Sequence, residues 1–212
     1  LPVTEGVVHA IPRYDIEALT MECELLPDWY LPHMGNTTLS ASARNAFLDI
    51  WTRMLAPVLA RPVTWTLRDY HSPNLIWLPG HTGIRQVGLL DFQDCVLGPP
   101  AYDVVSLSQD ARIDVPDDLE LRLLSHYVRL RRAADETFDA ATFAADYATM
   151  GAQRATKILG IFARLNKRDG KPQYLRHLPR IERNVRRCLM HPALSELRAW
   201  YLTHIPALFP KE

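Results

Sequence analysis

The segments RDYHSPN, at residues 68–74, and DFQD, at residues 91–94, are two polar stretches that each follow a short apolar run. The apolar runs have the β-branched and aromatic composition of strands and are VTWTL at 63–67, NLIWL at 74–78 and QVGLL at 86–90. Between the last two, PGHTG at 79–83 is typical of a hairpin turn. The pattern predicts a small β insert over residues 63–90 that carries carboxylates in the loops at its strand ends.

Helical periodicity dominates the rest of the chain. Asp15 is expected to cap a helix over residues 16–26 that runs into Pro27, and Ser40 to cap a second helix that Pro62 ends. The later helices are expected at residues 102–111, 117–132, 139–166, 173–190 and 193–203. The chain is therefore predicted to be one α+β domain, mostly α.

The composition narrows the possible partners. The chain has 212 residues, a formal net charge of zero and 48% apolar residues, as a folded globular domain does. The charge balance gives no electrostatic footprint for nucleic acid, and no apolar run approaches the roughly 20 residues of a membrane-spanning helix. Residues 1–10 lack the pattern of a secretory signal, so we expect a cytoplasmic protein. Trp51, Trp65 and Trp77 lie in patterned apolar stretches and are expected in the core.

The two polar loops contain the residue types that phosphoryl transfer to a hydroxyl requires. One carboxylate must orient the nucleophile and accept its proton, and further oxygen ligands must hold Mg²⁺ against the phosphates. Asp69 is followed five residues later by Asn74, and Asp91 stands at the end of the following hairpin. This order and spacing indicate a phosphotransferase site.

Together with GPPAYDVVSL at 98–107, these loops resemble those of the aminoglycoside phosphotransferase and choline kinase superfamily, which is protein-kinase-like. The segments YDIEALTMECELLPDWYL at 14–31 and MGAQRATKILGIFARLNKRDGKPQYL at 150–175 are most similar to bacterial kinases of N-acetylmuramate and N-acetylglucosamine. The resemblance covers nearly the whole chain. It implies a kinase-like C-terminal lobe over residues 1–212 that transfers the γ-phosphoryl group of ATP, with Mg²⁺, to a small-molecule hydroxyl in cell-wall recycling.

The resemblance also implies roles for individual residues. Asp69 matches the catalytic aspartate, and Asn74 and Asp91 match the magnesium ligands. Asp103 matches an aspartate that braces the loop of the catalytic aspartate from the following helix. His71 stands where related small-molecule kinases often carry a histidine, and would contact either the substrate or the loop backbone.

The chain departs from the family pattern at two positions. Leu67 replaces the histidine that braces the metal-binding loop in kinases, and Gln93 replaces the glycine of D-F-G. Next to it, Asp94 is either a second acid at the edge of the cleft or a capping residue.

Two further groups are candidates for binding the acceptor. Asp28 and Trp29 would meet sugar hydroxyls and ring faces, or else close a helix terminus. Arg154 and Lys157, three residues apart on a helix, would meet an anionic group such as the lactyl carboxylate of N-acetylmuramate, or else form a solvated face.

The sequence contains no glycine-rich G-x-G-x-x-G run, and no lysine precedes Lys157. Kinases of this type need both features in an ATP-binding lobe, so the sequence predicts that this N-terminal lobe lies outside the chain. Other acceptors, aminoglycosides or choline, stay open. So does a catalytically inactive kinase-like binding module, which Leu67 and the missing lobe favour and Asp69, Asn74 and Asp91 disfavour.

Overall fold

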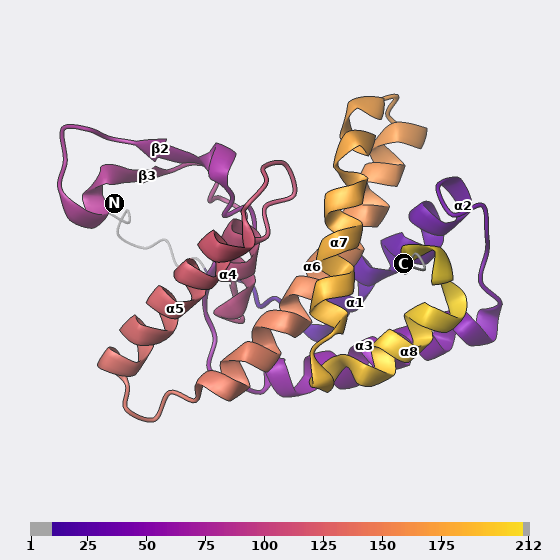
Figure 1. Cartoon of the computed structure of the whole chain (residues 1–212), viewed down its shortest axis with the longest axis horizontal. Helices are drawn as coiled ribbons and strands as arrows, with labels where there is room; N and C mark the ends of the chain where they lie inside the picture. The colour runs from indigo at the N-terminus through magenta and orange to yellow at the C-terminus, as the bar shows by residue number, and fades with distance from the viewer. Residues whose placement is uncertain (1–9, 210–212) are drawn as a thin grey trace.

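A computed structural model describes residues 10–209, most of them in helices, as Figure 1 shows. The helices are α1 (Ile16–Leu25), α2 (Leu31–His33), α3 (Ala41–Leu59), α4 (Ala101–Ser108), α5 (Asp117–Ala134), α6 (Ala140–Lys167), α7 (Leu178–Leu189) and α8 (Ser195–His204). The strands are β1 (Thr64–Thr66), β2 (Leu75–Trp77), β3 (Val87–Leu89) and β4 (Val96–Gly98). The predicted fold class is confirmed. Residues 1–9, on which the expected lack of a secretory signal rests, lie outside the described residues.

Both predicted N-caps form. The Asp15 carboxylate accepts a hydrogen bond from the Ala18 N–H at 2.9 Å, and the Ser40 hydroxyl accepts one from the Ala43 N–H at 3.2 Å. Each bond satisfies one of the donors that a helix leaves free at its start. None of the helices in the described part of the chain has the length and apolar character needed to cross a bilayer.

Proline does not stop the first helical segment where the sequence suggested. After α1 the backbone widens into a π-helical turn, Leu26–Tyr30, and continues into α2. Because Pro27 has no N–H to donate, the wider turn accommodates it, and the Leu31 N–H reaches back to the Leu26 carbonyl. The second helix likewise passes through Pro57 before it ends at Leu59.

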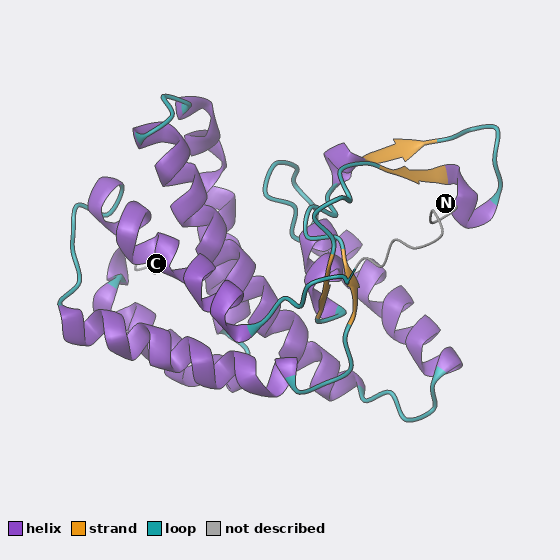
Figure 2. Cartoon of the chain, turned by 180° about the vertical axis from the view of Figure 1, so that it is seen from behind, coloured by secondary structure: helices purple, strands orange, loops and turns teal. Residues whose placement is uncertain are grey.

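The β insert is larger than predicted and consists of two separate sheets. Strand β2 pairs antiparallel with β3, as the hairpin turn indicated, while β1 pairs antiparallel with β4. The run at 96–98 was too short to be recognised as a strand, because it ends in Gly98 and two prolines follow it at once. The β2–β3 hairpin extends away from the helical body (Figures 1 and 2).

The prediction of three core tryptophans is correct only for Trp51, which is fully buried on α3. Trp65 and Trp77 are 67% and 64% exposed. The reason is architectural. The β1–β4 sheet is covered on the face of Thr66 and Val96, which are buried, whereas Trp65 lies on its other face, and the described residues leave Trp77 on the hairpin uncovered. On the hairpin, Leu75, Trp77, Val87 and Leu89 point to one side, since residues two apart in a strand and their direct partners share a face. We call these four residues the hairpin face.

The long helix α6 is the centre of the helical body. It packs against α1, α4 and α7, and residues along most of its length are buried. Its closest approach is at Gly160, where a β-carbon would overlap the backbone carbonyl of Leu25 at the end of α1. Glycine therefore permits a helix–helix contact that any side chain would push apart.

Gly160→Ala should lower the free energy of unfolding by about 2–3 kcal/mol, because the added methyl group meets backbone that cannot rotate away. Gly80→Ala is the matched control, since a β-carbon there meets nothing within 4 Å. Urea unfolding followed by circular dichroism measures both. Equal stability of the two variants would contradict the close contact.

Candidate active site

The loop of residues 67–74, here called the Asp69 loop, connects β1 to β2, and Asp91 stands two residues after β3. The hairpin brings Asn74 and Asp91 to the same end, because Leu75 pairs with Leu89 in the antiparallel register. The Leu90 N–H also donates to the Asn74 carbonyl at 2.9 Å. Two of the predicted site residues are thus adjacent through backbone pairing, although 17 positions separate them in the sequence.

The backbone is strained at both loops. Arg68 has φ +67° and Asp91 has φ +57°, in the left-handed region that non-glycine residues rarely occupy. Such conformations persist only where the surrounding structure enforces them, and they are concentrated at functional sites. Here they occur at Asp91 itself and directly before Asp69.

Two aspartates at the ends of α4 hold the Asp69 loop. The Asp103 carboxylate accepts the N–H of Leu67 at 2.6 Å and that of Arg68 at 3.1 Å. Asp110 accepts the Ser72 N–H at 2.9 Å. The contacts of Asp103 are those that its predicted bracing role requires. The role of Asp110 was missed, because nothing in the sequence distinguishes it from a surface acid after a helix.

Asn74 and Asp91 have the chemistry of a magnesium site. The Asn74 amide donates to the Asp69 carbonyl at 2.9 Å, which leaves its own oxygen free. One oxygen of Asp91 accepts the Gln93 amide at 2.7 Å, so the other is available. Hard oxygen donors of this kind suit Mg²⁺. No three His, Cys, Asp or Glu side chains gather into a metal site among residues 10–209, so other ligands would have to come from bound phosphates and water.

Asp69 borders a small cavity of about 80 Å³ that is rich in cationic side chains. Arg68, Arg112, Arg154 and Lys157 line it, and aromatic and aliphatic side chains of α4 and α6 complete its wall. Of the tentative acceptor-binding residues, Arg154 is therefore the one that the structure places beside Asp69.

Asp28, Trp29 and Asp94 do not line this cavity. The Asp28 carboxylate forms an ion pair with Arg44 of α3, and the Trp29 ring lies 5.8 Å from that of His33. Asp28 and Trp29 lie inside the continuous helical segment from α1 to α2, not at a helix terminus, and their contact with the acceptor stays a prediction. Asp94 is exposed, and its role stays a prediction.

His71 is buried, and its Nδ1 atom has no hydrogen-bond partner in the described part of the chain. Burial lowers the pKa of His71, and the positive charges of Arg112 and Arg154 add to this effect. The imidazole is consequently neutral at pH 7. The backbone N–H of His71 donates to the backbone carbonyl of Asp69 at 3.0 Å, which supports a role for His71 in holding the conformation of the Asp69 loop.

Glu22 of α1 forms an ion-pair network that the sequence did not reveal. Its carboxylate accepts Lys157 Nζ at 2.6 Å, an Arg68 amino group at 3.1 Å and the Gln153 amide at 3.0 Å, and the Tyr14 hydroxyl donates to it as well. Burial alone would raise the pKa of Glu22, but Lys157 and the other donors lower it below its usual range. The single Glu22 carboxylate is therefore shared by Lys157 and Arg68 at the cavity.

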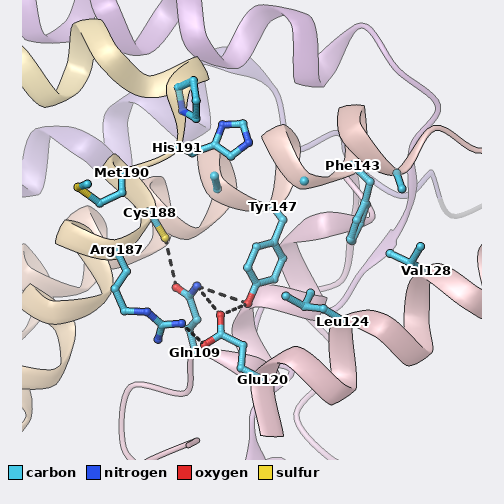
Figure 3. A pocket seen from close by; sticks show the side chains of 14 residues that line it. Gln109, Glu120, Leu124, Val128, Phe143, Tyr147, Arg187, Cys188, Met190 and His191 are labelled. Carbon is cyan, nitrogen blue, oxygen red and sulfur yellow. Dashed lines mark hydrogen bonds and ion pairs between the residues drawn. The ribbon is translucent and has the colours of Figure 1, made fainter. Parts of the chain in front are cut away.

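A cavity of about 490 Å³ lies elsewhere, between α5, α6 and α7 (Figure 3). Its mostly apolar wall contains one polar cluster, in which the buried Glu120 accepts hydrogen bonds from Arg187, Tyr147 and Gln109. No predicted site residue lines it. The chemistry is therefore expected at the smaller cavity beside Asp69.

Glu22→Gln should lower the free energy of unfolding by about 3 kcal/mol at pH 7, because it leaves the buried Lys157 ammonium without its carboxylate. Glu17→Gln, on the exposed side of the same helix, is the control. Urea titrations of both variants give the comparison.

The loss of stability caused by Glu22→Gln should depend on pH. Because the folded protein lowers the pKa of Glu22, its stabilisation is present above the unfolded pKa of about 4.3 and is lost as the pH falls through the lower folded value. The difference between wild type and Glu22→Gln should therefore shrink below about pH 4. A difference that stays constant from pH 7 to pH 3 would contradict the network.

Comparison with known proteins places the chain among phosphotransferases. Residues 9–145 match the phosphotransferase enzyme family. A Caulobacter vibrioides protein named N-acetylmuramate/N-acetylglucosamine kinase is 38% identical over 202 residues, which cover 95% of this chain and 54% of the relative. Proteins of the same name from Neisseria meningitidis serogroup B and Pseudomonas putida are 37% and 34% identical, covering 86% and 88% of this chain.

The chain spans about half the length of the curated relatives it matches. The family match nevertheless covers well over half of the chain, and it includes the Asp69 loop, the hairpin and Asp103. The resemblance inferred from these loops is thereby confirmed, and the chain belongs to the phosphotransferase enzyme family.

Proposed function

We propose that this chain carries the catalytic and acceptor-binding residues of an ATP-dependent kinase that phosphorylates a hydroxyl group of an amino sugar. The observation that carries the proposal is the arrangement at the Asp69 loop. A carboxylate borders a cavity there, while Asn74 and Asp91 are joined at the adjacent end of the hairpin. The names of the relatives support the reaction type and the sugar.

In the proposed reaction Asp69 orients the acceptor hydroxyl and accepts its proton. The free oxygens of Asn74 and Asp91 would hold Mg²⁺, which, when bound, neutralises charge on the phosphates of ATP. Asp103 keeps the loop in its strained conformation through the Leu67 and Arg68 N–H groups. The contribution of the protein is then positioning and fixed charge, as expected for phosphoryl transfer.

The charge of the cavity favours an amino sugar over the other acceptors considered. Aminoglycosides and choline are cations, whereas the cavity beside Asp69 is lined by three arginines and one lysine, of which only Arg68 and Lys157 form ion pairs within the described residues, both with Glu22. Like charges at such short range oppose binding. A neutral or anionic sugar is compatible with this wall, and N-acetylglucosamine and N-acetylmuramate have these two charges. Such an activity fits the recycling of cell-wall sugars in the cytoplasm, where ATP is available.

The proposed kinase also needs a lobe that binds the phosphates of ATP. We propose that an ATP-binding lobe, supplied by sequence outside this chain, packs over the hairpin face defined above. The support is the exposure of that face, where Trp77, Val87 and Leu89 are 64%, 40% and 42% exposed. Apolar side chains gathered on one face of a sheet are typical of an interaction surface.

Asp69→Asn should reduce kcat by about 10²–10⁴-fold, because the amide cannot accept the proton of the hydroxyl. Asp118→Asn, an exposed acid in the first turn of α5, is the matched control. The assay is Mg²⁺-dependent release of ADP by the full-length gene product with N-acetylglucosamine or N-acetylmuramate. Full activity of Asp69→Asn would overturn the assigned role. A folded full-length protein without any turnover would favour the inactive binding module.

Asn74→Ala and Asp91→Asn should raise the Mg²⁺ concentration for half-maximal turnover by about tenfold or more, because the first removes a ligand oxygen and the second the negative charge of a ligand, each a loss of roughly 1.5–3 kcal/mol. Titrating MgCl₂ at fixed, saturating concentrations of total ATP and sugar measures this shift. Gln93→Ala is the control for the hydrogen bond to Asp91. An unchanged Mg²⁺ dependence in both ligand variants would refute the metal assignment.

A further inference from the structure

Arg154 of α6 is a buried cation without a partner. Only 5% of the residue is exposed, yet among the described residues no acceptor is hydrogen-bonded to it and no carboxylate lies within 4.0 Å. Arginine stays protonated even when buried, and an uncompensated charge away from water is costly. The guanidinium borders the cavity that contains Asp69.

The neighbouring charges do not satisfy Arg154. Burial raises the pKa of Asp103, and Arg154 is one of the groups that oppose this rise, so the two side chains lie near each other. The Asp103 carboxylate is nevertheless directed at the Leu67 and Arg68 N–H groups, at 2.6 and 3.1 Å. His71, which Arg154 also influences, is neutral at pH 7.

Two of the other three cations of the cavity have a carboxylate partner, which Arg154 lacks among the described residues. Lys157 and Arg68 both contact the Glu22 carboxylate, at 2.6 and 3.1 Å. Arg112 is exposed at the rim, and its side chain has no ion pair with a described residue. Among the described residues, one interior and one peripheral cation therefore remain without an ion pair, because even the Asp69 carboxylate, which lines the same cavity, lies more than 4.0 Å from both.

A carboxylate on the acceptor would complete this arrangement. A guanidinium binds a carboxylate through two parallel N–H···O bonds, and such charge-assisted pairs are about twice as strong as neutral hydrogen bonds. The volume of about 80 Å³ is sufficient for a group of this size.

We infer that Arg154 binds a carboxylate of the acceptor and so makes the enzyme prefer an acidic amino sugar to its neutral counterpart. The inference rests on the proposed kinase function and names the group that distinguishes its acceptors. Arg154 then acts on specificity, while Asp69 performs the proton transfer with either acceptor.

The first test needs no variant. The full-length gene product is assayed with N-acetylmuramate, with the methyl ester of its lactyl group, and with N-acetylglucosamine. The ester keeps the shape of the acid but removes its charge. We expect kcat/KM to be at least about tenfold higher for the acid than for either neutral sugar, which corresponds to one buried charge-assisted contact.

The second test replaces the cation. Arg154→Met should lower kcat/KM for the acid by about 10–100-fold, mainly through KM, and change the two neutral sugars by less than about threefold. Arg154→Lys, which keeps the charge, should recover part of the preference. Arg164→Met, on the last turn of the same helix and away from the cavity, controls for loss of an arginine from α6.

The outcomes distinguish a failure of the Arg154–carboxylate contact from a failure of the proposed kinase function. If the acid and its ester react equally in the unchanged protein, or if Arg154→Met impairs all three sugars alike, the carboxylate contact is wrong and Arg154 has a structural or phosphate-directed role. If the unchanged full-length protein turns over none of the three sugars, the proposed function itself fails.

Discussion

Backbone hydrogen bonds from the Asp69 loop to the two ends of α4 are the contacts on which the geometry of the site depends. Asp103 holds Leu67 and Arg68, and Asp110 holds Ser72. Without these acceptors, three N–H groups of a loop with a left-handed residue would lack fixed partners. Because α4 packs on α6, the same framework fixes the loop and the cavity wall relative to each other.

The helix α6 supplies this wall together with its charges. Glu22 reaches it from α1 and neutralises Lys157, which lies 135 positions further along the chain. Arg154 is one turn away on α6 and has no such partner. Two cations on the same helix thus have different surroundings, one paired with a carboxylate from α1 and one without an ion pair among the described residues. In the proposed site, selection of the acceptor by charge would follow from this difference, which the packing of α1 on α6 sets up.

Local signals predicted the local features correctly. Asp15 and Ser40 were recognisable as caps because capping depends on residues three positions apart, and the hairpin depends on its turn. The polar loops were recognisable because their functional residue types lie only a few positions apart in the sequence, as Asp69 and Asn74 do. The π-helical turn at Pro27 could not be predicted, since tertiary packing rather than propensity keeps the chain helical there.

Features that join distant parts of the chain were not predictable from local pattern. Glu22 lies on the first helix and looks like an ordinary solvated acid until α6 packs against it. The partner of β1 is β4, three residues long, and only the fold brings them together. The exposure of Trp65 and Trp77 was equally unpredictable from local pattern, because an apolar side chain on a strand is buried only if another layer covers that face of the sheet.

The left-handed backbone at Asp91 has an evolutionary consequence. The position has to tolerate a φ of +57°, and in the proposed site it would also have to supply an oxygen for the metal. Aspartate and asparagine enter this conformation most readily among residues with an oxygen-bearing side chain, whereas β-branched residues are strained there. Glycine would relieve the backbone but would remove the ligand. Few residue types could therefore replace Asp91 during evolution without loss of the proposed site. A change of metal preference would have to arise from neighbouring residues.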